Sequence, residues 1–194
     1  MNNVEDFFEM ASTVALAIDV GTVERIIAGL VHLRAQRGRL FLIGAGGSAA
    51  NCSHATNDFR KLCGIDAICP TDNAAELTAR VNDDGWDTVF EAFLQTSHAG
   101  ERDALFVMSV GGGDLTRHIS VSLIRGIDEA KRRGMKVFGI VGRADSYTKS
   151  AGDEVVVIPV PEPTLLTPMS EAFQGIVWHA MVSDPRLLVR PTTW

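Results

Sequence analysis

The sequence predicts a three-layer αβα sandwich built on a five-stranded parallel sheet and preceded by N-terminal helices. From Arg39 onward, short apolar runs alternate with longer stretches of helical periodicity. Strands separated by helices of this length imply right-handed crossovers, and therefore a parallel sheet with helices on both faces. No long linker, low-complexity tract or internal repeat divides the chain, so we expect one domain over residues 1–194.

The N-terminal segment is expected to form two helices ahead of the sheet. Apolar residues recur at three- and four-residue spacing through residues 3–37, with a break at Gly21 and Thr22, and Gly38 ends the second helix. Apolar helices outside a βα core need a partner surface. We therefore expect residues 1–38 to join copies of this chain into a homo-oligomer.

The elements of the core follow in order along the chain. Strands are expected at 40–44, 65–69, 104–108, 136–141 and 154–159. Helices are expected at 48–62, 73–80, 84–97, 115–133, 145–151 and 168–183.

Composition excludes several classes of protein. The chain is 46% hydrophobic, yet no apolar run approaches the roughly 18 to 20 residues of a membrane span. A net charge of −6 provides no basic face for nucleic acid, and the acidic N-terminus does not resemble a signal peptide. The three cysteines form no CxxC pair and are expected to be reduced thiols. These features predict a cytoplasmic protein that binds neither membranes nor nucleic acid.

A glycine turn follows the first strand, in the sequence GAGGS. Gly46 and Gly47 lead into Ser48, where a helix is expected to begin, so backbone N–H groups and the helix dipole would converge on one anion. The alternative is a tight turn without a ligand. Position 49 is alanine, no acidic residue ends the next strand, and no Walker A motif is present, so we expect no nucleotide cofactor.

A second glycine loop, SVGGGD, follows the third strand at the same edge of the sheet. It is expected to contact an anion or a sugar through free N–H groups, although a flexible loop without a ligand is the alternative. Asp114 either caps the following helix or accepts hydrogen bonds from sugar hydroxyls. The residues concerned are Ser109, Val110, Gly111, Gly112 and Asp114.

Two helices carry paired polar residues. His54 and Asp58 stand four residues apart on one face, a pair that by itself is often structural. Glu171 and His179 stand eight residues apart, and thus on one face, of an otherwise apolar helix. Polar groups in apolar surroundings need partners, so we expect the four side chains to meet. Asp83 lies in a stretch that reads as a solvated turn.

Four stretches together resemble the sugar-isomerase (SIS) domain family. They are GAGGSAANCSHATNDFRK, SVGGGD, VFGIVGR and SEAFQGIVWHAM, and the resemblance extends over nearly the whole chain. Within the family the sequence is most similar to phosphoheptose isomerases, which interconvert sedoheptulose 7-phosphate and a D-glycero-D-manno-heptose 7-phosphate. The resemblance implies a flavodoxin-like SIS fold and a homotetramer with sites at subunit interfaces.

The resemblance also implies how a phosphorylated sugar would be bound. Ser48 matches the serine of the family's first loop, Ser109 matches the first residue of its phosphate-binding loop, and Asp83 matches an aspartate near the substrate. The second loop is hydroxyl-rich in most members. Three of those hydroxyl residues are replaced here, by Val110, Gly111 and Asp114.

Catalytic and metal-binding roles are implied in the same way. Asp58 lies where the isomerases have a glutamate base, and His179 lies where they have a histidine acid. His54 matches a histidine that helps to hold a divalent metal, usually zinc, and Glu171 lies where many members have glutamine. A zinc ion held by His54, Asp58, Glu171 and His179 is therefore a possibility that the sequence leaves open.

Two functions follow from the sequence. In the first, Asp58, or Glu171 in its place, takes a proton from the carbon next to the carbonyl, and His179 shuttles a proton at oxygen, giving an enediol. In the second, the chain is a non-catalytic SIS tetramer that binds a sugar phosphate or a protein partner.

Overall fold

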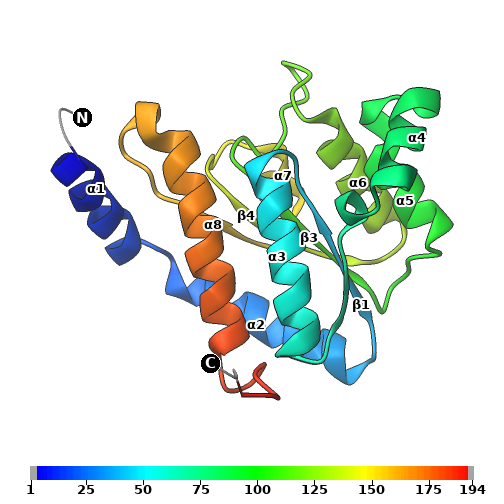
Figure 1. The fold of residues 1–194 in the computed structure, drawn as a ribbon, viewed down its shortest axis with the longest axis horizontal. Helices are drawn as coiled ribbons and strands as arrows, with labels where there is room; N and C mark the ends of the chain where they lie inside the picture. Colours follow the sequence, from blue (N-terminus) through cyan, green and yellow to red (C-terminus); the bar gives the residue numbers. More distant parts are fainter. Residues whose placement is uncertain (1–3, 192–194) are drawn as a thin grey trace.

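Five parallel strands form one sheet between two layers of helices in the computed structural model, which describes residues 4–191 (Figure 1). The strand order is β2-β1-β3-β4-β5, so the chain reverses its direction of winding between β1 and β3. The strands are β1 (Arg39–Ile43), β2 (Asp66–Ile68), β3 (Ala104–Ser109), β4 (Lys136–Val141) and β5 (Glu154–Val157). This arrangement confirms the predicted fold class, and each strand lies within two residues of its predicted bounds.

Helices connect the strands and also precede the sheet. The α-helices are α1 (Val4–Leu16), α2 (Val20–Ala35), α3 (Gly47–Lys61), α4 (Ala74–Asp84), α5 (Val89–Thr96), α6 (Val121–Arg132), α7 (Tyr147–Ala151) and α8 (Leu166–Ser183). Three short 3-10 helices lie at Pro70–Asp72, Trp86–Thr88 and Pro163–Leu165. No helix within residues 4–191 is long and apolar enough to cross a membrane.

The strands alternate between two hydrophobic cores. In β1, Leu40 and Leu42 face the core formed with α1, α2, α3 and α8, whereas Phe41 and Ile43 face the core formed with α5 and α6. All four side chains are fully buried. Because both faces of the sheet are covered, its strands read as continuous apolar runs.

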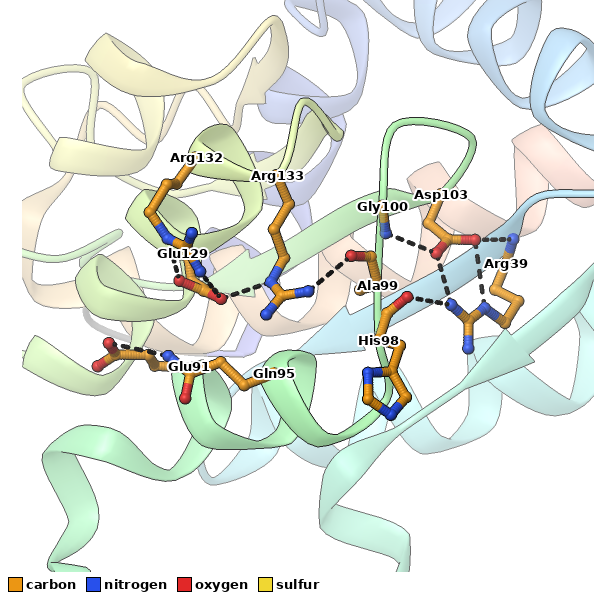
Figure 2. Close-up of polar contacts among 10 residues, drawn as sticks. All are labelled: Arg39, Glu91, Gln95, His98, Ala99, Gly100, Asp103, Glu129, Arg132 and Arg133. Carbon is orange, nitrogen blue, oxygen red and sulfur yellow. Dashed lines mark hydrogen bonds and ion pairs between the residues drawn. The ribbon is translucent and has the colours of Figure 1, made fainter.

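Ion pairs tie the loop between α5 and β3 to the amino edge of the sheet (Figure 2). Asp103, just before β3, accepts hydrogen bonds from the Arg39 backbone N–H (2.8 Å), the Arg39 guanidinium (2.7 Å) and the Gly100 N–H (3.0 Å). Burial opposes ionisation of Asp103, but the hydrogen bonds from Arg39 and Gly100 outweigh it and lower the pKa of the carboxyl. Arg133 pairs with Glu129 and donates to the carbonyl of Ala99. These contacts fix the ends of β1 and β3 opposite the edge that carries the glycine loops.

The break between the first two helices lies earlier than Gly21 and Thr22, where the sequence placed it. Both residues are in the first turn of α2, because Asp19 caps this helix and accepts a hydrogen bond from the Thr22 N–H (3.2 Å). Glycine and threonine are tolerated in a first turn whose N–H groups are satisfied by a cap. The expected helix at 84–97 is likewise divided, because Gly85 adopts φ 82° and ends α4.

The largest difference from the prediction lies at the start of the expected helix 115–133. Residues 114–119 form an antiparallel hairpin in which Asp114 and Ile119 exchange backbone hydrogen bonds, and the helix begins only at Val121. Asp114 therefore does not cap α6; it accepts from the Arg117 N–H and guanidinium instead, and these bonds lower the pKa of its carboxyl. The second glycine loop is therefore separated along the chain from the first turn of this helix by the hairpin.

Candidate active site

The two glycine loops flank the point where the sheet reverses direction. GAGGS follows β1 and SVGGGD follows β3, and these strands are neighbours. In open α/β sheets, ligands bind beyond the carboxyl ends of the strands at this reversal. The topology therefore brings together two loops that lie about 60 residues apart in the sequence.

The first loop places uncapped N–H groups at the start of α3. Gly46 adopts φ 60° and ψ −130°, which glycine tolerates, and contributes no side-chain cap. Gly44 lets the turn pack closely, because a Cβ there would lie 2.9 Å from the Met108 carbonyl oxygen and from the Ser48 carbonyl. The N–H groups of the first turn have no partner within the helix and carry the positive end of its dipole. This end of α3 is thus suited to an anion.

The second loop is rigid. Gly112 and Gly113 have positive φ, and the Ser109 hydroxyl accepts a hydrogen bond from the Gly112 N–H (2.9 Å). The carbonyl of Gly112 accepts from both the N–H and the hydroxyl of Thr148. The Ser109 hydroxyl therefore accepts one hydrogen bond from the loop and keeps its proton for a ligand, whereas a Cβ on Gly111 would meet nothing within 4 Å. The sequence suggested that this loop could be flexible, but its hydrogen bonds hold it in place.

Helices α3 and α8 lie side by side on one face of the sheet and run in the same direction, which carries the site away from the carboxyl ends of the strands (Figure 1). Gln174 of α8 is fully buried, donates to the Ser48 hydroxyl (3.1 Å) and accepts from Asn51 (3.1 Å). Asn51 also donates to the backbone carbonyl of Glu171 (3.0 Å). Gln174 and Asn51 were not among the predicted site residues, although an amide on an otherwise apolar helix, such as Gln174, needs a polar partner when it is buried.

Three of the predicted residues come together further along the two helices. His54, Asp58 and His179 each offer a ligand atom, and these atoms all lie within 4.8 Å of one another. The Nε2 of His54 lies 3.9 Å from a carboxylate oxygen of Asp58. The Nδ1 of His179 donates to the carbonyl of Gly175 (2.7 Å), since a carbonyl can only accept, and this leaves its Nε2 lone pair free. Such a tautomer suits either a metal ligand or a proton acceptor.

Trp178 forms the floor beneath the two imidazoles. It is fully buried, stacks on His179 with ring centroids 3.5 Å apart, and meets His54 edge-on at 4.8 Å. The histidines are exposed above it, so the group opens outward rather than into the core. An aromatic floor restricts the rotation of both rings and so preorganises them.

Two predicted site residues, Glu171 and Asp83, do not belong to the group formed by His54, Asp58 and His179. Among residues 4–191, the group that could hold a metal contains His54, Asp58 and His179 but not Glu171, so the expected set of four ligands is not assembled. The Glu171 carboxylate instead lies against Gly47: a Cβ there would be 2.6 Å from both carboxylate oxygens. Asp83 is exposed near the end of α4, which packs with α5 on the other face of the sheet.

Comparison with known proteins places these features in a family. Residues 17–142 match the SIS domain. A probable phosphoheptose isomerase of Thermoplasma volcanium is 27% identical over 80% of this chain and 79% of that protein. A phosphoheptose isomerase of Chlorobium phaeobacteroides is 29% identical over 72% of this chain, but the matched part spans only 61% of that protein. The structure of phosphoheptose isomerase GmhA from Neisseria gonorrhoeae superposes with a TM-score of 0.76 at 27% identity, covering 92% of this chain and 93% of that one. The chain belongs to the SIS domain family.

Proposed function

We propose that this protein is an aldose–ketose isomerase that interconverts sedoheptulose 7-phosphate and a D-glycero-D-manno-heptose 7-phosphate, or a close variant of this pair. The observation that carries the proposal is the group of His54, Asp58 and His179, which lies along α3 from an anion-binding helix terminus. The relatives named as phosphoheptose isomerases support the same reaction. A site that only binds sugar phosphate has no need of a carboxylate next to two imidazoles.

The phosphate would be bound at the carboxyl edge of β1 and β3. The N–H groups at Gly46, Gly47 and Ser48 supply the positive end of α3, and the hydroxyl protons of Ser48 and Ser109 remain free to donate. The loop from Val110 through Gly111 and Gly112 to Asp114 would border the same ligand, and Asp83 would approach it only from another subunit. Local N–H groups outweigh the net charge of −6 for an anion of this size.

Proton transfer would take place at the other end of the sugar. Asp58 removes the proton from the carbon next to the carbonyl, and His179, with both ring nitrogens protonated, delivers its Nε2 proton to the carbonyl oxygen, which gives the enediol and leaves Nε2 free to accept the proton lost from the other hydroxyl in the next step. Return of the first proton to the neighbouring carbon, with loss of a proton from the other hydroxyl, gives the product. Aspartate is one methylene shorter than the glutamate that the resemblance to the isomerases implies at this position, so the substrate must approach α3 more closely.

The donor set of this group fits zinc. Two imidazole nitrogens and a carboxylate oxygen are common zinc ligands, and the Gly175 carbonyl orients the His179 ring as outer partners of zinc ligands do. A fourth position would be filled by substrate, by water or by Glu171 after a change of rotamer. When bound, the metal would polarise the carbonyl of the substrate.

We further propose that the functional form is a homo-oligomer, a tetramer as in the resembling family, with residues 1–194 as its single domain in the cytoplasm. Val4, Phe8 and Leu16 of α1 and Ile176 of α8 are large apolar side chains with at least 55% exposure. Between α1, α2 and α8 lies a largely apolar cavity of about 270 Å³. A second copy that packs on this surface would also cover the exposed histidines, and the three buried free thiols suit a reducing compartment.

The test is to incubate the protein with sedoheptulose 7-phosphate in D₂O, with and without zinc, and to follow the aldose and deuterium at C2. An enediol mechanism gives both products. Tight binding of the sugar phosphate without aldose or deuterium in either condition would refute the isomerase and support the non-catalytic tetramer. Asp58→Asn should remove both signals without changing the circular dichroism spectrum.

A further inference from the structure

Helices α3 and α8 pack against each other mainly through apolar side chains. Ala55 and Phe59 of α3 and Val177 and Met181 of α8 lie in the same buried core. Apolar contacts have no preferred direction, whereas a hydrogen bond has a narrow range of distance and angle. The height of one helix relative to the other, which we call their register, is therefore defined most sharply by polar contacts between them.

Two amides make such a contact, Asn51 of α3 and Gln174 of α8. The Asn51 amide donates to the Gln174 side-chain oxygen (3.1 Å) and to the backbone carbonyl of Glu171 (3.0 Å), about one turn earlier in α8. Gln174 in turn donates to the hydroxyl of Ser48 (3.1 Å), about one turn earlier in α3 than Asn51. Gln174 is fully buried, so water does not compete for its hydrogen bonds. The hydrogen bonds thus span two successive turns of each helix.

Both amides lie within two turns of the side chains that could hold a metal. His54 and Asp58 follow Asn51 by three and seven residues, so all three lie on one face of α3. His179 follows Gln174 by five residues on α8. Because a helix rises about 1.5 Å per residue, a shift of α8 along α3 by one residue would displace His179 by about 1.5 Å. A functional group of this kind tolerates an error of only about 0.5 Å.

A close approach at Gly175 connects the amides to the ring of His179. The Gly175 carbonyl accepts from His179 Nδ1 (2.7 Å), and a Cβ on Gly175 would lie 3.7 Å from the Asn51 side-chain oxygen. Asn51 of α3 therefore lies next to the residue of α8 that orients the imidazole.

We propose that Asn51 and Gln174 are positioning residues, which fix the register of α8 against α3 and thereby hold His179 close to His54 and Asp58. This inference rests on the proposed function for the role of those three side chains. A buried amide pair adds little net stability compared with apolar side chains of similar size, but every arrangement that separates the two amides leaves buried polar groups without partners. The pair therefore specifies the geometry of the site more than it stabilises the fold.

The experiment replaces both amides by apolar side chains of similar size, in the double variant Asn51→Leu/Gln174→Met. The variant should fold, because the Glu171 carbonyl keeps its helical N–H partner. Its affinity for zinc, measured by competition with a chelating dye, should fall about tenfold or more. In the metal-free protein, the nuclear Overhauser effect (NOE) between the rings of His54 and Trp178, whose centroids lie 4.8 Å apart, should weaken or vanish.

Thr56→Val is the matched control. Thr56 is buried on α3, and its hydroxyl donates to the Cys52 carbonyl of the same helix (2.8 Å), so the substitution removes a buried polar group without breaking a hydrogen bond to α8. This variant should keep the wild-type zinc affinity and NOE. Asn51→Ala removes two of the interhelical hydrogen bonds but introduces a good helix former, and it should show smaller losses in both measurements.

The inference requires that zinc affinity and NOE both decrease in the double variant, or in Asn51→Ala if the double variant does not fold; a change in neither or in only one would overturn it. Equal losses in Thr56→Val would also overturn it, because any missing buried polar group would then have this effect. If the wild type binds no zinc, the NOE alone decides. If the wild type itself shows no NOE, the geometry behind both this inference and the proposed function is wrong. Both losses in the double variant, with no isomerase activity in the wild type, would support the inference and refute the reaction.

Discussion

Asp103→Asn should destabilise the fold by about 3 kcal/mol, because it breaks the buried ion pair at the amino edge of the sheet. One carboxylate oxygen accepts from the Arg39 N–H and Nε, and the other accepts from Arg39 Nη2 and the Gly100 N–H. An asparagine presents an NH₂ group to two of these four donors whichever way it is oriented. The side chain of Asp103 is only 8% exposed, so water cannot replace the lost acceptor for the backbone N–H, whereas it can reach part of Arg39, which is 31% exposed.

The measurement is urea denaturation at pH 7, with thermal unfolding as a second readout. A loss of about 3 kcal/mol corresponds to a decrease in Tm of roughly 6–12 °C for a chain of this size. Asp145→Asn is the control, since its pair with Arg143 is 70% exposed on the aspartate side and screened by water, and its urea midpoint should match that of the wild type. If the free energies of unfolding of Asp103→Asn and the wild type differ by less than about 1 kcal/mol, the ion pair does not stabilise the amino edge of the sheet.

Because of the ion pair between Asp103 and Arg39, we also expect the stability of the fold to depend on pH. The pKa of Asp103 is lowered in the folded protein, so its contribution is complete above the unfolded pKa of about 4 and disappears as the pH falls through the folded value. Asp103→Asn has no carboxyl to protonate. The gap in stability between the two proteins should therefore be largest at pH 7 and shrink below about pH 4; a constant gap would mean that the charge of Asp103 contributes nothing.

Three further predictions concern the site. Asp58→Asn and His179→Gln should each lower kcat by about 10²- to 10⁴-fold with the fold intact, as expected for a general base and acid, and an unchanged rate would remove that residue from the mechanism. His54→Ala should weaken zinc binding, measured by competition with a chelating dye, by about 100-fold or more, whereas His32→Ala, on α2, should leave it unchanged. Gly112→Ala should cost about 2–4 kcal/mol, because the residue has φ 66° and its Cβ would lie 2.5 Å from Ser146, whereas Gly111→Ala, whose Cβ meets nothing, should be nearly neutral in thermal unfolding.

Most of the fold could be predicted because its strands are buried on both faces and appear as short apolar runs between helical stretches. The hairpin at residues 114–119 could not. Leu115 and Ile119 have the spacing of one helix face, yet both are exposed, and the turn between them is set by the bonds from Arg117 to Asp114. The spacing of apolar residues indicates which residues could share a helix face. It does not indicate that the Asp114 side chain will accept the Arg117 N–H in place of a helical backbone carbonyl.

Within the site, the sequence could predict which residues share a helix face but not how far along the helices they meet. His54 and His179 come together because α3 and α8 both start at the carboxyl edge of the sheet and run in the same direction. The same parallel arrangement places Glu171, eight residues before His179, level with Gly47 rather than with His54. A helix rises about 1.5 Å per residue, so Glu171 lies some 12 Å from His179 along the axis of α8. The contact between the two helices therefore has two separate ends, the proposed anion site at the carboxyl edge of the sheet and the proposed proton-transfer group further along α3 and α8, and a substrate that engages both must be extended and carry its phosphate far from its carbonyl. A seven-carbon sugar with a terminal phosphate meets this requirement.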